Sequence, residues 1–561
     1  MSLQAQLERL GRGWRGPALA ALVALIAGLP GLIAMPPLDR DESRFAQATA
    51  QMLETGDFVV IRFQDEPRFK KPVGIHWMQA ASVAAFSEAE AREIWAYRIP
   101  SLLGAMLAAA ACAWGAAAFF GGPAGLLAGA ILGSTFLLST EAFIAKTDAM
   151  LAGTTTLALA ALGRIYAAHR GGPPAGRRVR LLFWLGLSLS ILVKGPVGPM
   201  VALLTGLALW AWDRKADWAR TLAWGWGLIL TAAIVGPWAA AVTVATDGGF
   251  WITALGGDFA PKLVGGHESH GAPPGYHTLL LPLLIFPGAL LLPAALVHAW
   301  KFRAEPGVRF ALCWLVPAWI VFEITPTKLV HYTLPTYGAL AWLMAAAALQ
   351  PLGDKVRWGG AALSGFVGVV LAAAVLYLQA EYGDASDLSV AAATALLLGA
   401  AGLVGAYMLI RRAGILAIAA TAGLTVAGHG AFAGAFAPRL DPLWLSQRAE
   451  QALTHARLAP RQGFAPAPVA VAGYAEPSLV FALGTPTDLG GVGQAVQALA
   501  EGRPAIVEAR EQAAFEAALA ARGVSAREVA RLEGLNYSRG DETLLRIYAP
   551  AARPAPPREI P

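Results

Sequence analysis

The stretch LDRDESRFAQATAQMLETGDFVVIRFQDEPRFKKPVGIHW, residues 38–77, is the longest polar run in the N-terminal half of the chain. An apolar segment at 17–36 precedes it, and another begins near residue 97. The run combines many acidic and basic side chains with a late histidine and tryptophan, His76 and Trp77. A protein that only sat in a membrane would not need such a loop, so we expect the rest of the chain to be organised around it.

The composition of the whole chain is that of a membrane protein. Of its 561 residues, 56% are hydrophobic and 14% are charged, whereas soluble domains carry about 25% charged residues. The apolar residues fall in runs of about 18 to 24, the length that a helix needs to cross a bilayer. We therefore predict a polytopic α-helical membrane protein. The net charge of +6 is spread among loops, which argues against nucleic-acid binding, and Cys112 and Cys313 lie too far apart in apolar runs to suggest a disulfide framework.

Hydropathy predicts about 13 transmembrane helices, the first of them an uncleaved N-terminal helix. Basic residues recur in alternate loops, which places the N-terminus in the cytoplasm and the C-terminal tail outside it. Four lysines in the outer loops go against this bias, and a shared anionic ligand at the outer face explains them: Lys146, Lys194, Lys262 and Lys328. The predicted spans are 17–36, 97–119, 123–140, 149–168, 180–193, 196–212, 219–242, 277–300, 307–323, 331–349, 358–379, 388–410 and 414–436.

The chain divides into two predicted domains. Residues 1–437 form the transmembrane domain, with a first periplasmic loop at 37–96. Residues 438–561 form a small extracytoplasmic α/β domain, because strand-like segments such as PVAVAGY and RPAIVEAR alternate with helix-like segments such as EQAAFEAALAARG. No cofactor fingerprint occurs in it, and a cap or docking module is the simplest interpretation.

The first loop begins with a short helix. DESRFAQATAQMLETGD places Asp41 and Glu42 in the first helical turn, where carboxylates are favoured, and Gly56 at the end. Its apolar face suits a helix that lies in the membrane interface: Phe45, Ala48 and Met52. The two acids either only cap the helix, or one of them is a carboxylate at the membrane surface that orients or deprotonates an acceptor hydroxyl.

The second part of the loop, PRFKKPVGIHW, brings basic side chains to a helix start. Pro72 is suited to open a helix, so Lys71 lies beside a helix N-terminus that already favours anions. Consecutive extended side chains point to opposite faces, so only one of Lys70 and Lys71 faces a given site. The alternative is a solvated basic pair.

Further polar residues lie in the other outer turns. STEAFIAKTDAML places Glu141, Lys146 and Asp148 at the mouth of two spans, where acids are either paired or functional. A structural pair of Asp148 with Lys146 or Arg98 is the alternative. Lys194 lies at a helix break, and TPTKLVHYTLP forms another break with Lys328, His331 and Tyr332, of which His331 is equally consistent with an ordinary interfacial histidine.

The 243–276 loop and the residue after it hold several metal-ligand types: Asp258, His267, Glu268, His270 and His277. The H-E-S-H spacing differs from the helical H-E-x-x-H of zinc peptidases, and glycines and prolines surround it. We interpret the loop as a flexible lid over a substrate groove. His267 and His270 remain candidate ligands of a divalent metal.

These motifs resemble the first-loop signature of bacterial lipid A 4-amino-4-deoxy-L-arabinose transferases, relatives of the protein O-mannosyltransferases. The resemblance continues through YRIPSLLGA, KTDAM, VKGP, HGAP and TKLVHYTLP and so covers about the first 340 residues in order. It implies the C-type glycosyltransferase (GT-C) membrane fold. It also implies inverting transfer of a sugar from an undecaprenyl-phosphate carrier at the periplasmic side of the bacterial inner membrane, with no required cofactor.

The resemblance also implies roles for individual residues. Asp41 matches the catalytic aspartate of the family's first loop, and Asp148 matches the acid of its second loop. The expected donor-phosphate ligands are Lys71, Lys194, Lys328, Arg44 and Arg98. The expected lining of the substrate groove is Glu42, Lys70, His76, Trp77, Asp258, His270, His331 and Tyr332.

One position departs from the family. Members that transfer aminoarabinose have a glutamate where this chain has Lys70, and that glutamate helps to hold a zinc ion with a histidine like His270. Its loss weakens the case for a metal and for aminoarabinose as the donor sugar. The expected acceptor is lipid A or another cell-envelope glycolipid. A protein O-glycosyltransferase and, in another class, a flippase or transporter of lipid-linked sugars are the alternatives. Transporters usually have internal repeats and polar residues near the midplane, whereas the ionisable residues here cluster at one membrane face, which favours surface chemistry.

Overall fold

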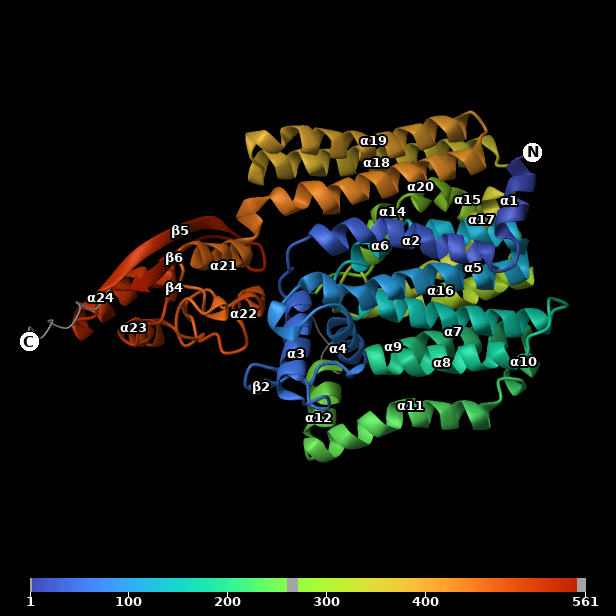
Figure 1. The fold of residues 1–561 in the computed structure, drawn as a ribbon. Helices are drawn as coiled ribbons and strands as arrows, with labels where there is room; N and C mark the ends of the chain where they lie inside the picture. Colours follow the sequence, from blue (N-terminus) through green and yellow to red (C-terminus); the bar gives the residue numbers. More distant parts are fainter. Residues whose placement is uncertain (1–2, 260–270, 552–561) are drawn as a thin grey trace, which may run out of the picture.

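The computed structural model describes residues 3–259 and 271–551. Its long helices run side by side, and a smaller α/β domain lies beyond one end of them (Figure 1). Within the described residues, eight helices are long and apolar enough to cross a membrane, or nine if one pair bent by 110° counts as a span. The eight are α2 (Arg15–Ala34), α5 (Ile94–Gly133), α7 (Asp148–Ala168), α11 (Trp224–Ala245), α16 (Pro306–Ile324), α18 (Asp354–Tyr382), α19 (Leu388–Ile410) and α20 (Gly414–Ala431).

The other predicted spans correspond to shorter, merged or bent helices. α5 consists of two helical segments that meet at a kink, where Gly121 has a φ of 83°. The two segments correspond to two predicted spans. The bent pair joins Tyr276–Leu284 to Gly288–Lys301. The remaining candidates are α8 (Arg177–Lys194), α9 (Val197–Asp213) and α17 (Tyr337–Ala348). The total of thirteen spans therefore stays a prediction.

Small residues bring α5 and α7 close together. A Cβ atom on Gly104 would lie 2.5 Å from the Met150 backbone, and one on Gly153 would lie 2.4 Å from the Gly104 carbonyl oxygen. Helices in membranes associate through such close contact, because lipid supplies no hydrophobic force between them. This contact fixes the N-terminal end of α7, where Asp148 lies.

The first loop folds across one end of the bundle. It contains α3 (Asp41–Thr55), a two-stranded ribbon of β1 (Arg62–Phe63) and β2 (Glu66–Pro67), and α4 (Gly74–Phe86). The predicted helix start and end are confirmed, with Gly56 at φ 71° after the last turn. The predicted apolar face is too narrow, however. Residues 45–52 are all buried, because α4 packs on α3 from within the transmembrane domain and α22 (Pro477–Leu483) packs on it from the C-terminal domain.

The C-terminal domain is a four-stranded sheet with helices. The sheet order is β3 (Ala470–Ala472), β4 (Ala505–Glu508), β6 (Asp541–Pro550) and β5 (Ala526–Asn536), with β3 and β4 parallel and the other pairs antiparallel. Besides α22, its helices are α21 (Leu445–His455), α23 (Val492–Ala500) and α24 (Gln512–Arg522). The strands and helices predicted here are confirmed.

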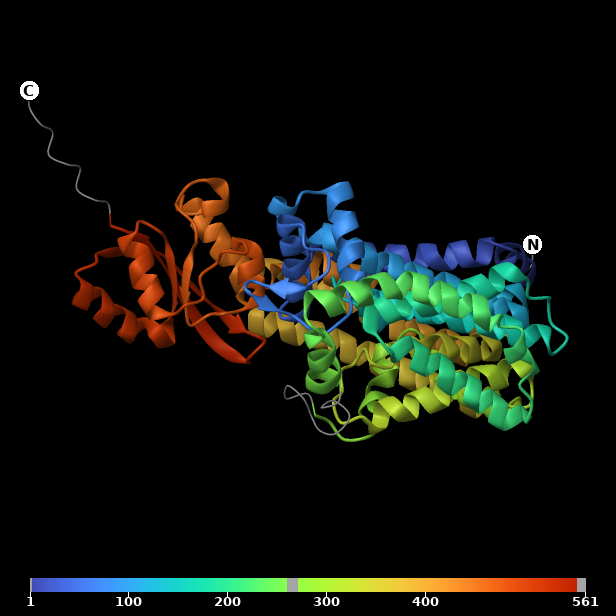
Figure 2. The same cartoon turned by 90° about the horizontal axis from the view of Figure 1, so that it is seen from below.

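Both views place the C-terminal domain at the end of the bundle where α3 and α4 lie (Figures 1 and 2). That arrangement agrees with the predicted topology, in which the first loop and the C-terminal tail share one side of the membrane. Short helices complete the chain: α1 (Leu3–Gly11), α6 (Phe136–Glu141), α10 (Asp217–Arg220), α12 (Gly249–Trp251), α14 (Tyr276–Leu284), α15 (Leu292–Lys301) and the 3-10 turn η4 (Leu334–Thr336).

Candidate active site

A cluster of charged side chains lies where the first loop meets three helix ends. Asp148 is the first residue of α7 and Lys194 is the last residue of α8, and the two form an ion pair. An acid at a helix start and a base at a helix end are each favoured by the helix dipole. Gly195, at φ 61°, ends α8 directly after Lys194.

Lys146 joins the acids of this cluster. Its Nζ lies 3.1 Å from Glu141 Oε1 and 3.6 Å from Asp148 Oδ2. His331 lies between the same groups, with Nδ1 3.2 Å from Lys146 Nζ and Nε2 3.5 Å from Asp148 Oδ1. All four side chains are buried. The α6–α7 turn and the turn before η4 therefore converge on one point, as the outer-loop lysines predict.

Asp41 lies at the exposed edge of the cluster. Its side chain is 52% exposed, and its Oδ1 lies 4.0 Å from a guanidinium nitrogen of Arg68. Desolvation by neighbouring atoms raises the pKa of Asp41. The positive charges of Lys146 and Arg68 outweigh this effect and hold the pKa below its usual value. Asp41 is therefore ionised at neutral pH and accessible to a substrate.

Burial also acts on Glu141. It raises the pKa of Glu141, which Asp148 raises further while Lys146 lowers it. One Glu141 oxygen, Oε2, is buried without a hydrogen-bond partner among the described residues. Lys146, Lys194 and Arg68 lie around the acids of this cluster, so an anionic ligand would meet several positive charges here.

Several predicted residues lie around this cluster. Lys194 Nζ is 5.4 Å from the centre of the Tyr332 ring. Lys328 is buried and donates hydrogen bonds to the carbonyl oxygens of Ala272 and Thr325, at 2.9 and 2.6 Å. Lys71 is half-buried and donates to the Lys70 carbonyl oxygen at 3.1 Å. Lys328 is thus held by the backbone, and its contact with a ligand stays a prediction.

Arg98 and Glu42 correct the sequence prediction. Both are buried, with 0% and 1% of the side chain exposed, and they form a bidentate ion pair at 2.8 Å. The remaining N–H groups of Arg98 donate to backbone carbonyl oxygens, including those of Met35 and Pro36. Because all its donors are engaged, Arg98 holds the end of α2 against α3 and has none left for a phosphate. Glu42 completes this pair and does not line a groove.

His76 and Trp77 both make contacts within the first loop. The His76 ring stacks on Phe45, and its Nδ1 lies 2.8 Å from Thr49 Oγ1. Burial lowers the pKa of His76 to about 3, so the ring is neutral. Trp77 Nε1 donates to the Phe58 carbonyl oxygen, which ties α4 to the loop. His76 is fully buried and does not line a groove, whereas Trp77 is 37% exposed and its place in the substrate groove stays a prediction.

Arg44 is half-buried and forms no side-chain hydrogen bond or ion pair with the part of the chain that the structure describes. The side chain of Asp258 and residues His267 and His270 lie outside the described residues. Arg68 was not among the predicted site residues, although its place after Pro67 in the same charged loop was a usable signal. Asp39 was also absent from the site residues predicted from the sequence.

Three groups have the chemistry of metal ligands. One atom each from Glu141, Asp148 and His331 lies within 4.8 Å of the others. Lys146 and Lys194 already pair with both carboxylates, however, and a divalent cation would have to displace these ammonium groups. The described residues therefore fit an anion better than a metal at this point.

Comparisons with known proteins agree on the class of this chain. Residues 38–252 match the family model of dolichyl-phosphate-mannose-protein mannosyltransferases. The chain is 32% identical over 364 residues to the undecaprenyl phosphate-alpha-4-amino-4-deoxy-L-arabinose arabinosyl transferase of Pseudomonas paraeruginosa strain DSM 24068 / PA7. That match covers 62% of this chain and 64% of the relative, so it spans less than two thirds of the relative's length.

The fold gives the wider match. ArnT from Cupriavidus metallidurans, solved bound to undecaprenyl phosphate, superposes with a TM-score of 0.74 at 21% identity, over 96% of this chain and 99% of that one. The apo oligosaccharyltransferase of Archaeoglobus fulgidus has a TM-score of 0.50 at 12% identity, over 97% of this chain and 75% of that one. The chain thus has the GT-C fold of membrane glycosyltransferases. Its sequence and its fold are similar to those of ArnT proteins over the parts that these comparisons cover.

Proposed function

We propose that the protein is an inverting glycosyltransferase of the bacterial inner membrane. It moves a sugar from an undecaprenyl-phosphate-linked donor to an acceptor at the periplasmic face, and the acceptor is lipid A or another cell-envelope glycolipid. The main support is the placement of ionised, accessible Asp41 beside a base-rich cluster that contains Asp148, Lys146 and Lys194. Within this proposal, residues 1–437 carry the transferase site and residues 438–561 form a separate domain.

The bases act on the donor. As the acceptor oxygen attacks the anomeric carbon, the bond from that carbon to the phosphate oxygen breaks, and undecaprenyl phosphate leaves with an added negative charge. Lys194 lies at the surface end of α8, where it stabilises this charge with help from Lys71 and Arg44. The ion pair with Asp148 holds the Lys194 ammonium in place before the donor arrives.

Asp41 acts on the acceptor. Its carboxylate accepts a hydrogen bond from an acceptor hydroxyl, orients the oxygen and takes the proton as the new bond forms. Its low pKa makes it a weak base, so orientation and charge stabilisation carry more of its effect than proton abstraction from the free hydroxyl. If the acceptor is a phosphate, no proton has to be taken and only the positioning role remains.

A second candidate acceptor is a protein hydroxyl. The match to the protein mannosyltransferase family model includes the whole first loop and so favours this alternative. A deletion strain separates the two: intact-mass analysis of lipid A and of periplasmic proteins shows which of them loses a sugar. Loss of a sugar from lipid A supports the proposal, and loss from proteins alone replaces it with the second candidate.

A transfer assay tests the reaction itself. Purified protein in lipid nanodiscs is mixed with the undecaprenyl-linked sugar fraction of the parent strain and with lipid A, and the masses of both lipids are followed. The proposal requires a sugar-sized mass gain on the acceptor together with release of undecaprenyl phosphate. Movement of the labelled lipid across the bilayer without sugar transfer would instead support a flippase.

A further inference from the structure

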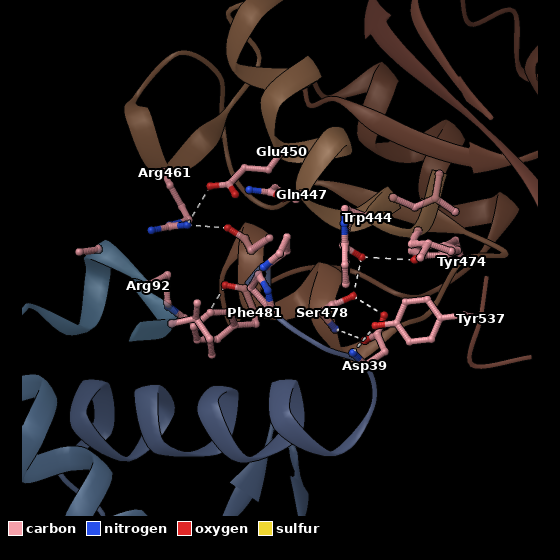
Figure 3. Close-up of a pocket in the computed structure, with 18 residues that line it drawn as sticks. Asp39, Arg92, Trp444, Gln447, Glu450, Arg461, Tyr474, Ser478, Phe481 and Tyr537 are labelled. Atoms are coloured by element: carbon pink, nitrogen blue, oxygen red, sulfur yellow. Dashed lines mark hydrogen bonds and ion pairs between the residues drawn. The ribbon is translucent and has the colours of Figure 1, made fainter. Parts of the chain in front are cut away.

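The C-terminal domain is bonded to the residues that lead into α3. The Asp39 carboxylate accepts two hydrogen bonds from Ser478, one from the backbone N–H at 2.8 Å and one from the side-chain hydroxyl at 2.6 Å (Figure 3). The backbone N–H of Asp39 in turn donates to the Tyr537 hydroxyl at 2.7 Å. Ser478 lies in α22 and Tyr537 lies just after β5, so two separate parts of the domain hold one residue of the loop.

The next residue is held as well. Arg40 Nε lies 3.2 Å from Glu476 Oε2, and Glu476 is only 2% exposed. Asn536 Nδ2 donates to Glu476 Oε1 at 2.9 Å, which fixes the carboxylate from the domain side. Asp41 follows directly in the chain, so both residues before it are attached to the C-terminal domain.

The network around Ser478 has a defined direction. The Ser478 hydroxyl donates to Asp39, so it is left to accept the hydrogen bond from the Ser446 hydroxyl, whose oxygen lies 2.6 Å away. Ser446 and Ser478 are both buried. A cavity of about 210 Å³ runs along the same seam and is lined partly by Asp39, Ser478 and Tyr537. Directed polar contacts, more than close apolar packing, therefore set the position of the loop here.

We propose that Ser478 and Glu476 are positioning residues that fix the start of α3 and thereby aim the Asp41 carboxylate at the acceptor. This inference rests on the proposed function, because it takes Asp41 as the group that meets the acceptor. It assigns the C-terminal domain a role in the chemistry although none of its residues up to 551 contributes a side chain to the cluster around Asp148. A displacement of about 1 Å in a reacting group lowers rates by as much as 100-fold, so a loosened helix start is expected to reduce turnover.

The test measures kcat and KM separately in full-length protein. Ser478→Ala and Glu476→Gln are each expected to lower kcat about ten-fold. The KM for the undecaprenyl-linked donor is expected to change less than kcat, because Lys194 and Lys71 lie outside α3 and only Arg44 lies on it. In a double-mutant cycle, Asp39→Asn combined with Ser478→Ala is expected to lose no more than the larger single effect, since both variants break the same contact.

Two controls separate positioning from loss of stability. Phe515→Leu alters the buried core of the same domain away from the seam and is expected to lower Tm without lowering kcat. Glu501→Gln breaks an exposed ion pair with Arg503 and is expected to change neither. If Ser478→Ala and Glu476→Gln keep normal kcat, or if kcat falls with Tm in the Phe515 variant to the same degree, the positioning role is wrong.

The proposed function fails in a different way. Near-normal transfer by Asp41→Asn would show that Asp41 is not the acceptor group and would remove the basis of both proposals. An inactive Asp41→Asn together with fully active Ser478 and Glu476 variants would leave the proposed function intact and overturn only the role of the C-terminal domain.

Discussion

Lys194, the last residue of α8, is ion-paired with Asp148, the first residue of α7. The pair joins two helix ends whose dipoles favour these charges, and it lies among Lys146, Glu141 and His331. A base held in this way has a fixed position before any ligand binds, so little reorganisation accompanies the build-up of charge on a leaving phosphate.

The first prediction concerns this pair. Lys194→Ala is expected to lower transfer by about 100-fold or more, because one electrostatic contact with the developing charge is lost. Lys194→Arg keeps the charge with a different shape and is expected to retain measurable activity. Rates are measured with donor in excess, and Tm is measured in parallel. An alanine variant with normal turnover would remove Lys194 from the donor site.

The second prediction concerns Asp41. Asp41→Asn keeps the size of the side chain and removes its charge, so transfer is expected to fall by about 100-fold to 10,000-fold, the usual range for a group that assists proton transfer. Because Asp41 is half-exposed, Tm is expected to stay within about 1 °C of the parent protein. Asp65→Asn, an exposed acid of the same loop, is the matched control and should leave the rate unchanged.

Much of this site was predictable because charge in an apolar sequence is informative. Asp41, Asp148 and Lys194 each lie at a helix boundary that glycine, proline or hydropathy marks in the sequence. Lys146 and Lys194 meet at Asp148, which is the structural pairing given as the alternative for Lys146. A ligand shared by the outer-loop lysines stays a prediction. The fold class and the elements of the C-terminal domain followed from the same patterns.

The errors have a common physical cause. Arg98 and Glu42 bear the same charges as the site residues, and sequence alone does not show that their donors and acceptors saturate one another inside the protein. Asp39 was missed because its partners, Ser478 and Tyr537, lie more than 400 residues away in the chain. Local patterns report helix ends and apolar faces, but they do not report contacts between distant segments.

The third prediction follows from the buried pair of Arg98 and Glu42. Glu42→Gln is expected to lower stability by about 3–5 kcal/mol, because removal of one charge leaves the other buried and unpaired. The loss is expected to be visible as poor expression or a lower Tm, with no change in the KM for the donor in whatever protein folds. A stable Glu42 variant with a raised KM for the donor would show that Arg98 and Glu42 do belong to the donor site.

The fourth prediction compares two neighbouring lysines. Lys71→Ala is expected to reduce transfer by more than about ten-fold, whereas Lys70→Ala is expected to have a smaller effect, because consecutive extended side chains face opposite ways. The two variants have the same change in charge and the same place in the loop, so each controls for the other. Equal effects on the KM for the donor would show that the pair acts only through its net charge.

The last prediction uses the burial of Asp39 at the domain seam. The pKa of Asp39 is raised to about 6, mainly by burial and also by the charge of Glu476. The hydrogen bonds from Ser478 and the charge of Arg40 act in the opposite direction. Tyr474 and Tyr537 also face the carboxylate. The folded protein therefore holds this proton more tightly than the unfolded chain, in which the pKa is about 3.8. As pH rises from about 4 to about 6, the unfolded chain loses its proton first, so stability from this group declines by up to about 3 kcal/mol and then stays constant.

Asp39→Asn isolates this effect because asparagine has the same size and does not titrate. Tm is measured in detergent from pH 4.5 to pH 7.5 for both proteins, and the other titrating groups contribute equally to each. The parent protein is expected to lose Tm relative to the variant between pH 4.5 and pH 6, with a constant difference above that range. Parallel curves over the whole range would show that Asp39 does not titrate at the seam, and that the bonds from Ser478 keep it ionised throughout.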